Sequence, residues 1–281
     1  MKYTTPSAFR QALNDRLSTQ AREQGIDRSR LQKRLAFERY LARLFTLQRD
    51  RFVLKGGYAL ELRLGDRARA TQDLDFAVPI ATPEAILEDL RDAADLDLGD
   101  FLRYEVSLPS SRPLVGPPAG GYRYRVEARL DGQFPYAIFF LDVGMGDVQL
   151  NPSEERLAHI DLEFAGLETP SFPITPLPEH FTEKLHAYTR PRSERTRVKD
   201  LVDLVLIIGE LKLEPNASLS QVIRATFALY SSHDLPAPQD MTAPPETWQE
   251  PFKVMMLELQ LEPTDALEAH GMLVTFLERL P

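Results

Sequence analysis

The segment QDLDFAV, residues 72–78, places two acids one residue apart in a pattern that alternates polar and apolar side chains. Such alternation is typical of a β-strand, in which residues i and i+2 point to the same side of the sheet. Asp73 and Asp75 would then project together, and the apolar residues that alternate with them would face the core. Two carboxylates held this close repel each other, and a bound cation such as Mg²⁺ relieves the repulsion. The segment therefore predicts a strand with a core on one side and an acid pair on the other.

A pair of glycines precedes this strand at a turn. Gly56 and Gly57 follow the strand-like run RFVLK, 51–55, and precede the helix-like run YALELRL, 58–64. Backbone N–H groups at such a turn, together with the positive end of the helix, can bind an anion such as a triphosphate. Mg²⁺ is commonly bound by one or two carboxylates plus substrate phosphates. A phosphate-binding turn near metal-binding acids predicts phosphoryl or nucleotidyl transfer.

We expect a third carboxylate from a neighbouring strand. The run FFLDVGMGD, 139–147, carries Asp142 among apolar residues, where an acid without a partner would be costly. Asp142 is therefore the candidate third metal ligand. Taken singly, each of these acids could equally be a turn or cap residue, and it is the combination that favours a site.

The first hundred residues are predicted to contain helices and then alternating strands and helices. Apolar residues at helical spacing predict two helices between residues 5 and 50, with a break at EQGID, 23–27. Strands and helices alternate from there to residue 100. Thr82 stands before a proline and is a typical N-cap for a helix over 82–96.

The following residues, 101–172, are rich in strand-like patterns. The runs YRYRVEARL, 122–130, and YAIFFLDVGMG, 136–146, predict an antiparallel pair joined around Asp131 and Gly132.

A proline-rich passage, TPSFPITPLPEH, separates this region from an almost wholly helical remainder. We therefore predict an α+β domain with N-terminal helices over 1–175 and a helical domain over 176–281.

The composition excludes several kinds of site. The chain has no cysteine, which excludes disulfides, thiolate nucleophiles and cysteine-ligated zinc. The net charge of −9 argues against general attraction to nucleic acid, but charge is unevenly distributed. Residues 1–51 carry twelve Lys or Arg against five Asp or Glu, whereas residues 205–281 carry four against eleven. Neither a run of transmembrane length nor a secretory signal is recognisable, so we expect a cytoplasmic protein with no membrane partner.

A second group of charged residues lies on two helix-like runs. Lys184 and Tyr188 are one turn apart on the first run, and Asp200 and Asp203 share a face of the second. Lys184 could reach a triphosphate as a point charge. One of the aspartates could anchor Lys184, contact the nucleotide or help to activate an acceptor hydroxyl. The alternative is a solvated pair of helices.

Basic residues between these two runs form a candidate surface for the phosphates of an RNA acceptor. They are Arg190, Arg192, Arg195, Arg197 and Lys199. A solvated face is equally compatible with the pattern. If RNA binds elsewhere, the basic N-terminal helices are the alternative, around Arg28, Arg30, Lys33 and Arg34.

In combination, these motifs resemble the nucleotidyltransferase superfamily of polymerase-β type, and within it the AbiEii/AbiGii toxin family that includes the mycobacterial MenT toxins. The first block is Gly-Gly followed by Arg-x-Thr-x-Asp-x-Asp-Phe, at residues 56–57 and 69–76. The second is a Lys-Leu-x-Ala helix followed by a Lys-Asp-x-x-Asp helix, at residues 184–187 and 199–203. The family has Ser or Gly after the first Gly, and Gly57 keeps the backbone donors but lacks a hydroxyl.

The resemblance implies an α+β nucleotidyltransferase fold with a mixed sheet and a C-terminal helical domain, with the active site in the cleft between them. It implies Mg²⁺ or Mn²⁺ as cofactor and an NTP as substrate. The candidate catalytic residues are Asp73, Asp75, Asp142, Lys184, Asp200 and Asp203, of which the first three would bind the metal. The candidate NTP-binding residues are Gly56, Gly57, Arg69, Thr71 and Lys184, with Thr71 expected on the same side of the strand as Asp73.

The resemblance also implies the biological role. A toxin of a toxin–antitoxin or phage-defence system would transfer NMP to an RNA acceptor, most plausibly the 3′ end of tRNA, and would have a cognate antitoxin. Two alternatives stay open: transfer to a small hydroxylated molecule, and a catalytically inactive homologue that only binds. His180 and His186 lack metal-ligand spacing, so we expect them to be helix or core residues.

Overall fold

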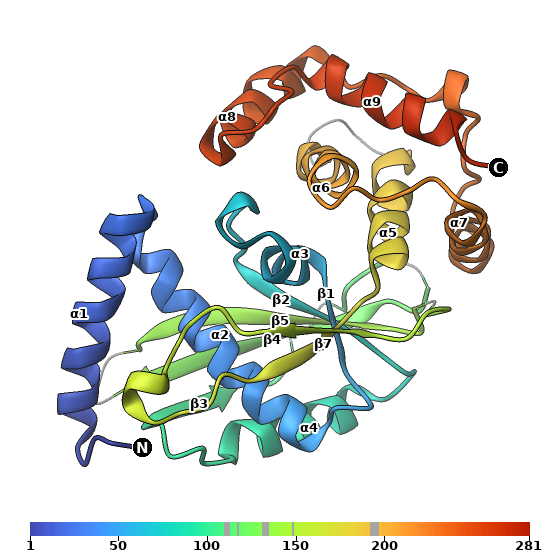
Figure 1. Cartoon of the computed structure of the whole chain (residues 1–281). Helices are drawn as coiled ribbons and strands as arrows, with labels where there is room; N and C mark the ends of the chain where they lie inside the picture. Colours follow the sequence, from blue (N-terminus) through green and yellow to red (C-terminus); the bar gives the residue numbers. More distant parts are fainter. Residues whose placement is uncertain (110–112, 117, 131–134, 148, 192–196) are drawn as a thin grey trace. The chain divides into compact units, whose positions relative to one another are not determined.

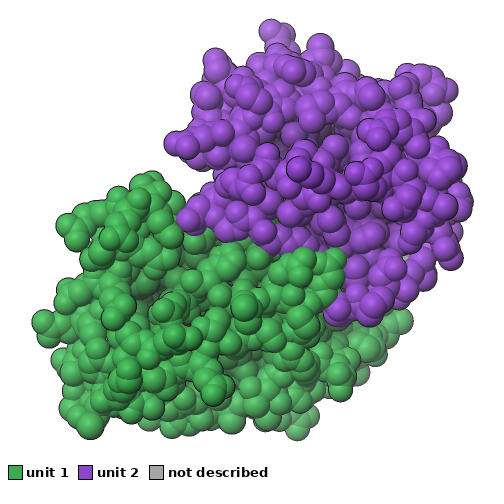
Figure 2. Space-filling model, in the orientation of Figure 1, with its two compact units in different colours: residues 1–62, 70–146, 154–174 green, residues 63–69, 147–153, 175–281 purple. Residues whose placement is uncertain are grey.

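The computed structural model describes the chain except for residues 110–112, 117, 131–134, 148 and 192–196 (Figure 1). The described residues form two compact units, which are coloured separately in Figure 2. Unit 1 comprises residues 1–62, 70–146 and 154–174, and unit 2 comprises residues 63–69, 147–153 and 175–281. The loop expected at Asp131 and Gly132 lies outside the described residues. The division into functional domains at residue 175 stays a prediction.

Unit 1 contains a mixed sheet. Its strands are β1 (Val53–Lys55), β2 (Asp73–Val78), β3 (Leu102–Val106), β4 (Gly121–Leu130), β5 (Ala137–Met145), β6 (Glu154–Leu157) and β7 (Ser171–Ile174). They lie in the order β3-β4-β5-β2-β1-β7-β6. β2 pairs parallel with β5 and antiparallel with β1, while β4 pairs antiparallel with β3 and with β5. The α+β class, the mixed sheet and the antiparallel β4–β5 pair are confirmed.

The proline-rich passage contains a strand that the sequence reading missed. β7 lies within it, pairs antiparallel with β6, and pairs parallel with β1 through Leu54 and Ile174. Pro173 has no N–H to donate, but the pairing with β1 involves the residue after it, so the proline does not interrupt that contact. The passage is therefore part of the sheet before it leads into the helices.

Four helices begin in unit 1. They are α1 (Pro6–Gln24), α2 (Arg28–Leu47), α3 (Gly56–Leu64) and α4 (Pro83–Asp95), and the 3₁₀ turn η2 spans Glu163–Ala165. α1 ends at Gly25, whose φ of 66° gives the left-handed cap that stops the helix. The hydroxyl of Thr82 accepts from the Ala85 N–H at 3.2 Å, so the predicted N-cap of α4 is confirmed. Side chains of α1, α2 and α4 share one core with the buried face of the sheet.

A buried carboxylate on α2 joins three segments of unit 1. Glu38 accepts hydrogen bonds from the N–H groups of His159 and Ile160, at 2.6 and 2.9 Å, and from the Tyr58 hydroxyl at 3.0 Å. Burial raises the pKa of Glu38 to about 7. These bonds hold α2, α3 and the segment after β6 together.

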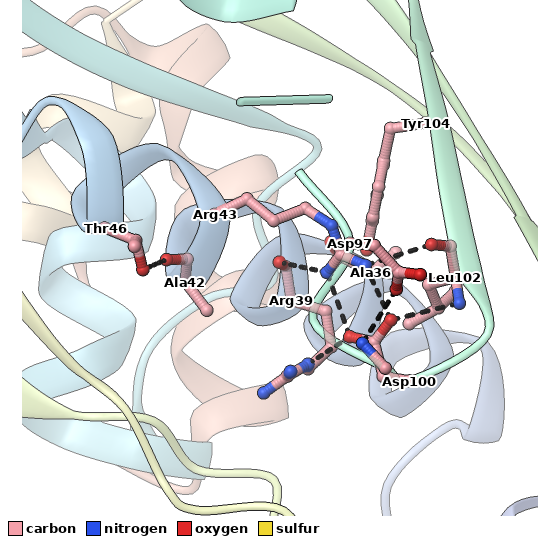
Figure 3. A network of polar contacts seen from close by, with 10 residues as sticks. Ala36, Arg39, Ala42, Arg43, Thr46, Asp97, Asp100, Leu102 and Tyr104 are labelled. Atoms are coloured by element: carbon pink, nitrogen blue, oxygen red, sulfur yellow. Dashed lines mark hydrogen bonds and ion pairs between the residues drawn. The ribbon is translucent and has the colours of Figure 1, made fainter. Parts of the chain in front are cut away.

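A second buried carboxylate fixes α2 against the segment between α4 and β3 (Figure 3). Arg43 donates to both oxygens of Asp100, at 2.9 and 2.6 Å, and Arg39 donates to Oδ2 at 2.7 Å. The N–H of Leu102 donates to Oδ1 at 3.1 Å. Burial alone would raise the pKa of Asp100, but the bonds and charges of Arg43 and Arg39 hold it below its usual value. Arg43 and Asp100 are fully buried, so each depends on the other for compensation of its charge.

Unit 2 consists mostly of helices. They are α5 (Leu177–Thr189), α6 (Val198–Gly209), α7 (Ala217–Tyr230), α8 (Gln249–Leu259) and α9 (Ala266–Glu278), with the 3₁₀ turns η1 (Gly65–Arg67), η3 (Pro238–Asp240) and η4 (Glu246–Trp248). The helical character expected after the proline-rich passage is confirmed. α5 packs on α6 and α7, and α6 packs on α8 and α9. None of the helices in the described ranges combines the length and apolar character that a membrane span requires.

The Asp100 network gives a prediction for stability. Asp100→Ala should lower the free energy of unfolding by about 3–5 kcal/mol, because it leaves two buried guanidinium groups without their carboxylate. Glu155→Ala is the matched control, since it breaks an ion pair with Arg49 whose side chains are 50% and 44% exposed. The control should cost about 0–1 kcal/mol in urea denaturation. Equal losses of unfolding free energy in Asp100→Ala and Glu155→Ala would contradict the role of Asp100 as the partner of the two buried guanidinium groups.

Candidate active site

The two acids of β2 lie on one face of the sheet, as predicted. Leu74, Phe76 and Val78 are buried on the other face, while Asp73 and Asp75 are partly exposed. The predicted sidedness of the strand is therefore confirmed.

The sheet register extends this face into a row of charged residues. Asp75 lies opposite Asp142 of β5 on one side and opposite Lys55 of β1 on the other. Asp142 in turn lies opposite Arg123 of β4. Because paired residues of neighbouring strands point to the same face, these four side chains form a charged row across β1, β2, β5 and β4. With Asp73, the row contains three acids and two cations, so one negative charge remains.

Arg123 is the site residue that the sequence reading missed. Its Nε donates to Oδ1 of Asp142 at 2.6 Å, and its Nη2 donates to Oδ2 at 2.5 Å. The same Nη2 reaches Oδ2 of Asp73 at 3.3 Å. The bidentate bond to Asp142 raises the pKa of Arg123, so the guanidinium stays charged. A signal was present in YRYRVEARL, where Arg123 alternates with apolar residues on a strand paired to the one that carries Asp142.

The ion pair with Arg123 compensates the charge of Asp142, which lies on a strand of mostly apolar residues. The expected partner was a metal, but both carboxylate oxygens bind Arg123. Across the described part of the chain, no group of three or more His, Cys, Asp or Glu side chains is arranged to hold a metal. The role of Asp142 as a metal ligand stays a prediction, and the contact in the structure is a bidentate ion pair.

Gly56 brings the glycine turn and the acid pair together. It is the first residue of α3 and has a φ of 63°, a left-handed conformation that favours glycine. A Cβ atom at this position would lie 2.0 Å from Oδ2 of Asp75 and 2.8 Å from its Cβ. The Asp75 carboxylate therefore occupies the space that the missing side chain leaves.

The oxygens of Asp73 and Asp75 fit a divalent cation such as Mg²⁺ or Mn²⁺. They are hard ligands on one face, they are partly exposed, and Asp75 is packed against Gly56. Mg²⁺ needs only one or two carboxylates when substrate phosphates supply further oxygens. Asp73 and Asp75 are thus the residues that would hold the metal.

Unit 2 contains a separate charged cluster formed by α5, α6 and Arg69. Lys184 Nζ lies 2.7 Å from Asp203 Oδ2 and 3.4 Å from Asp200 Oδ1. Arg69 binds both oxygens of Asp203 at 2.8 Å. Arg197 donates to the other oxygen of Asp200 at 2.9 Å. The sequence reading placed the first four of these residues in the site, and the structure brings them into one hydrogen-bonded group.

Charge pairing in this cluster overcomes the effect of burial. Burial alone would raise the pKa of Asp203, but Lys184 and Arg69 hold it well below its usual value. Burial alone would lower the pKa of Lys184, yet Asp203 and Asp200 raise it. Asp203 and Lys184 therefore stay charged at neutral pH. The three cations and two carboxylates of the cluster leave one positive charge, which suits a phosphate.

The expected basic surface is only partly described. Arg192 and Arg195 lie outside the described residues. Arg190 follows α5, Arg197 is engaged with Asp200, and Lys199 is exposed on α6. An RNA-binding role for this surface stays a prediction.

The alternative RNA surface on the N-terminal helices is weakened by internal pairing. Arg30 and Arg34 of α2 both bind Glu61, at 3.0 and 2.6 Å. Lys33 donates to the side chain of Gln72. Of the four basic residues, Arg28 is the one that is exposed.

The position expected for Thr71 is wrong, whereas the positions expected for the two histidines are confirmed. β2 begins at Asp73, so the expectation that Thr71 lies on the strand is wrong; its hydroxyl donates to the Asp73 carbonyl at 3.3 Å. This bond turns the Thr71 side chain back onto the backbone of the strand end. His180 and His186 are buried on α5, as expected for core residues.

A family model described as "Nucleotidyl transferase AbiEii toxin, Type IV TA system" matches residues 39–270. The chain belongs to this family. The matched range contains both the charged row of unit 1 and the charged cluster of unit 2, so the AbiEii assignment covers every candidate catalytic residue. The chain is accordingly a nucleotidyltransferase of a toxin–antitoxin family, and the resemblance inferred from the motifs is confirmed.

Solved structures similar to the AbiEii chain come from bacteria and a fungus. MenT4, a nucleotidyltransferase toxin of Mycobacterium tuberculosis, is 19% identical with a TM-score of 0.46, over 83% of this chain and 93% of that one. JHP933 of Helicobacter pylori is 17% identical with a TM-score of 0.47, over 88% and 94%. An antigenic nucleotidyltransferase-like protein of Paracoccidioides brasiliensis is 16% identical with a TM-score of 0.43, over 69% and 84%. No functionally curated protein is significantly similar to the chain.

The packing of Asp75 against Gly56 gives a prediction that separates a clash from backbone strain. Gly56→Ala should lower the free energy of unfolding by clearly more than Gly25→Ala. Gly25 has nearly the same φ, 66°, but a Cβ there meets nothing within 4 Å. Gly25→Ala should therefore lower the free energy of unfolding only by the cost of a left-handed backbone conformation, about 1–2 kcal/mol. Urea denaturation of both variants is the measurement, and equal losses would show that Asp75 does not occupy this space.

Proposed function

We propose that the chain transfers a nucleoside monophosphate from an NTP to an RNA acceptor, most plausibly the 3′ end of tRNA, and releases pyrophosphate. The observation that carries this proposal is the acid pair Asp73 and Asp75, which is fixed on one face of the sheet against Gly56. Membership of the AbiEii family supports nucleotidyl transfer as the reaction class. The identity of the acceptor and the dependence on a metal are proposals that go beyond what membership of the family supports.

In this reaction the residues of unit 1 would hold the metal. A Mg²⁺ or Mn²⁺ ion, when bound, would neutralise phosphate charge and orient the triphosphate. Asp73 and Asp75 would hold that ion, since their side chains lie on the same side of β2. Gly56 leaves room for the Asp75 carboxylate, and Arg123 keeps Asp142 and Asp73 in place by its hydrogen bonds. Arg123 is thus a positioning residue for these acids, and Asp142 stays a candidate third metal ligand.

The residues of unit 2 supply positive charge. Lys184 is kept protonated by Asp203 and Asp200, so it can bind phosphate oxygens as a fixed cation. Asp203 is fully buried and bound to both Lys184 and Arg69, which makes it a positioning residue. Gly57 and Arg69 remain candidate contacts of the NTP.

The transfer step is an in-line displacement at the α-phosphorus. The oxygen of the acceptor hydroxyl forms a bond to the α-phosphorus, and the proton of the hydroxyl passes to water. The bond from the α-phosphorus to the oxygen that bridges the α- and β-phosphates breaks, and pyrophosphate leaves with that oxygen. Such a step needs mainly positioning and neutralisation of charge, which the two charged groups supply.

We further propose a cytoplasmic location and a cognate antitoxin as partner. The family description as the toxin of a type IV system supports the antitoxin. An enzyme that modifies RNA in its own cell would require such a partner to control its activity.

A labelling experiment tests the proposed function. The protein is incubated with Mg²⁺, total tRNA and each NTP labelled at the α-phosphate, and the label should enter tRNA. Label at the γ-phosphate should leave with pyrophosphate. Asp75→Asn should reduce incorporation by at least about a hundredfold, because it removes a metal ligand. Asp95→Asn, an exposed acid of α4, is the matched control and should transfer normally.

Other outcomes distinguish the alternatives. A labelled small molecule in a cell extract, without labelled tRNA, would move the acceptor to small hydroxylated compounds. Absence of any labelled product would favour a homologue that only binds. Normal transfer by Asp75→Asn would remove the acid pair from the site.

A further inference from the structure

A pocket inside unit 2 has the lining of a nucleotide-binding site. It has a volume of about 540 Å³, within the range of small-molecule sites, and it lies between the end of α5 and the segment 233–248. Aromatic, cationic and neutral polar side chains line different parts of its wall.

The aromatic part consists of Tyr188 and Trp248. Their ring centroids are 6.1 Å apart with an interplanar angle of 63°, and both side chains are mostly buried. The Tyr188 hydroxyl is 2.8 Å from Nδ1 of His270, which fixes the orientation of the ring. Burial lowers the pKa of His270, so this contact joins two neutral groups. Rigid aromatic faces of this kind bind unpaired nucleobases by stacking.

The cationic part consists of Arg190 and Arg197. Arg197 is held by Asp200, which also contacts Lys184 at 3.4 Å, so the pocket adjoins the charged cluster of unit 2. Among the described residues, the buried Nε of Arg197 has no hydrogen-bond partner and remains a free donor. Guanidinium groups bind phosphate oxygens through several N–H donors at once.

The polar part can contact the edge of a base. Both ring nitrogens of His233 are engaged within the protein, Nε2 with the Thr189 hydroxyl at 2.9 Å and Nδ1 with the Ser232 hydroxyl at 3.0 Å, so His233 shapes the wall of the pocket. The carboxylates of Asp234 and Asp240 also line the pocket and can accept from the amino group of a base. These carboxylates would repel a phosphate, so we expect the phosphate on the side of the pocket that carries Arg190 and Arg197.

We propose that this pocket binds one nucleotide, with the base against Tyr188 and Trp248 and the phosphate at Arg190 and Arg197. The nucleotide belongs either to the NTP or to a single-stranded end of the RNA acceptor, and the nature of the ligand rests on the proposed function. The pocket would then select the base of the bound nucleotide.

Trp248 is the single tryptophan of the chain, so its fluorescence reports directly on this pocket. The Asp75→Asn protein, which should not consume substrate, is titrated separately with each NTP and with a single-stranded RNA hexamer that has a 5′ hydroxyl. Ribose 5-phosphate is the control without a base. Saturable quenching by an NTP or by the hexamer, and none by ribose 5-phosphate, is the expected result. The ligand that quenches identifies the source of the nucleotide.

A pair of variants tests the cationic part. Arg190→Gln should raise the dissociation constant of the quenching ligand about tenfold, because one charged hydrogen bond to phosphate is lost. Arg224→Gln, an exposed residue of α7 outside the pocket, should leave it unchanged.

Absence of quenching by every nucleotide ligand, equal quenching by ribose 5-phosphate, or an unchanged dissociation constant in Arg190→Gln would overturn the proposal. Quenching needs no transfer of NMP. Its outcome is therefore independent of whether labelled RNA forms, and a failure of the proposed function would be seen separately in the labelling experiment.

Discussion

The position of β2 in the sheet is the constraint on which the candidate site depends. Leu74 and Phe76 are fully buried, and the strand lies between β5 and β1, so its register is fixed from both sides. A slip of one residue would turn the two aspartates into the core and the apolar residues toward solvent. The cost of burying unpaired carboxylates makes that arrangement inaccessible. The buried core therefore fixes the face on which the acid pair lies, and Gly56 and Arg123 contact its two side chains there.

Charges of opposite sign are divided between the two units. The charged row of unit 1, together with Asp73, has one more acid than cations, whereas the cluster around Lys184 has one more cation than acids. Metal-assisted nucleotidyl transfer in general uses carboxylates to bind the metal and cations to bind the phosphates. Internal ion pairs, such as those of Arg123 and of Asp203, fix side chains within each unit.

Local patterns in the sequence predicted most of the fold and the placement of two groups of candidate site residues. The alternation in QDLDFAV located the acid face, and helical spacing located Lys184 opposite Asp200 and Asp203. The residue-by-residue register of paired strands was not predicted in this way. Arg123 is 19 residues from Asp142, and their pairing follows from the β4–β5 register. β7 was missed because its prolines indicate a loop, although its pairing with β1 tolerates them, and Thr71 was placed on a strand that begins two residues later.

The central claim is that Asp73 and Asp75 bind a divalent metal together with a nucleotide, and binding of Mn²⁺ tests it without any transfer step. Electron paramagnetic resonance measures free Mn²⁺ in solutions of the protein with an NTP analogue that cannot be cleaved between the α- and β-phosphates. The wild-type protein should bind Mn²⁺ more tightly when the analogue is present, and a folded Asp73→Asn, Asp75→Asn double variant should lose this gain. Equal nucleotide-dependent binding of Mn²⁺ by the wild-type protein and the double variant would contradict the account.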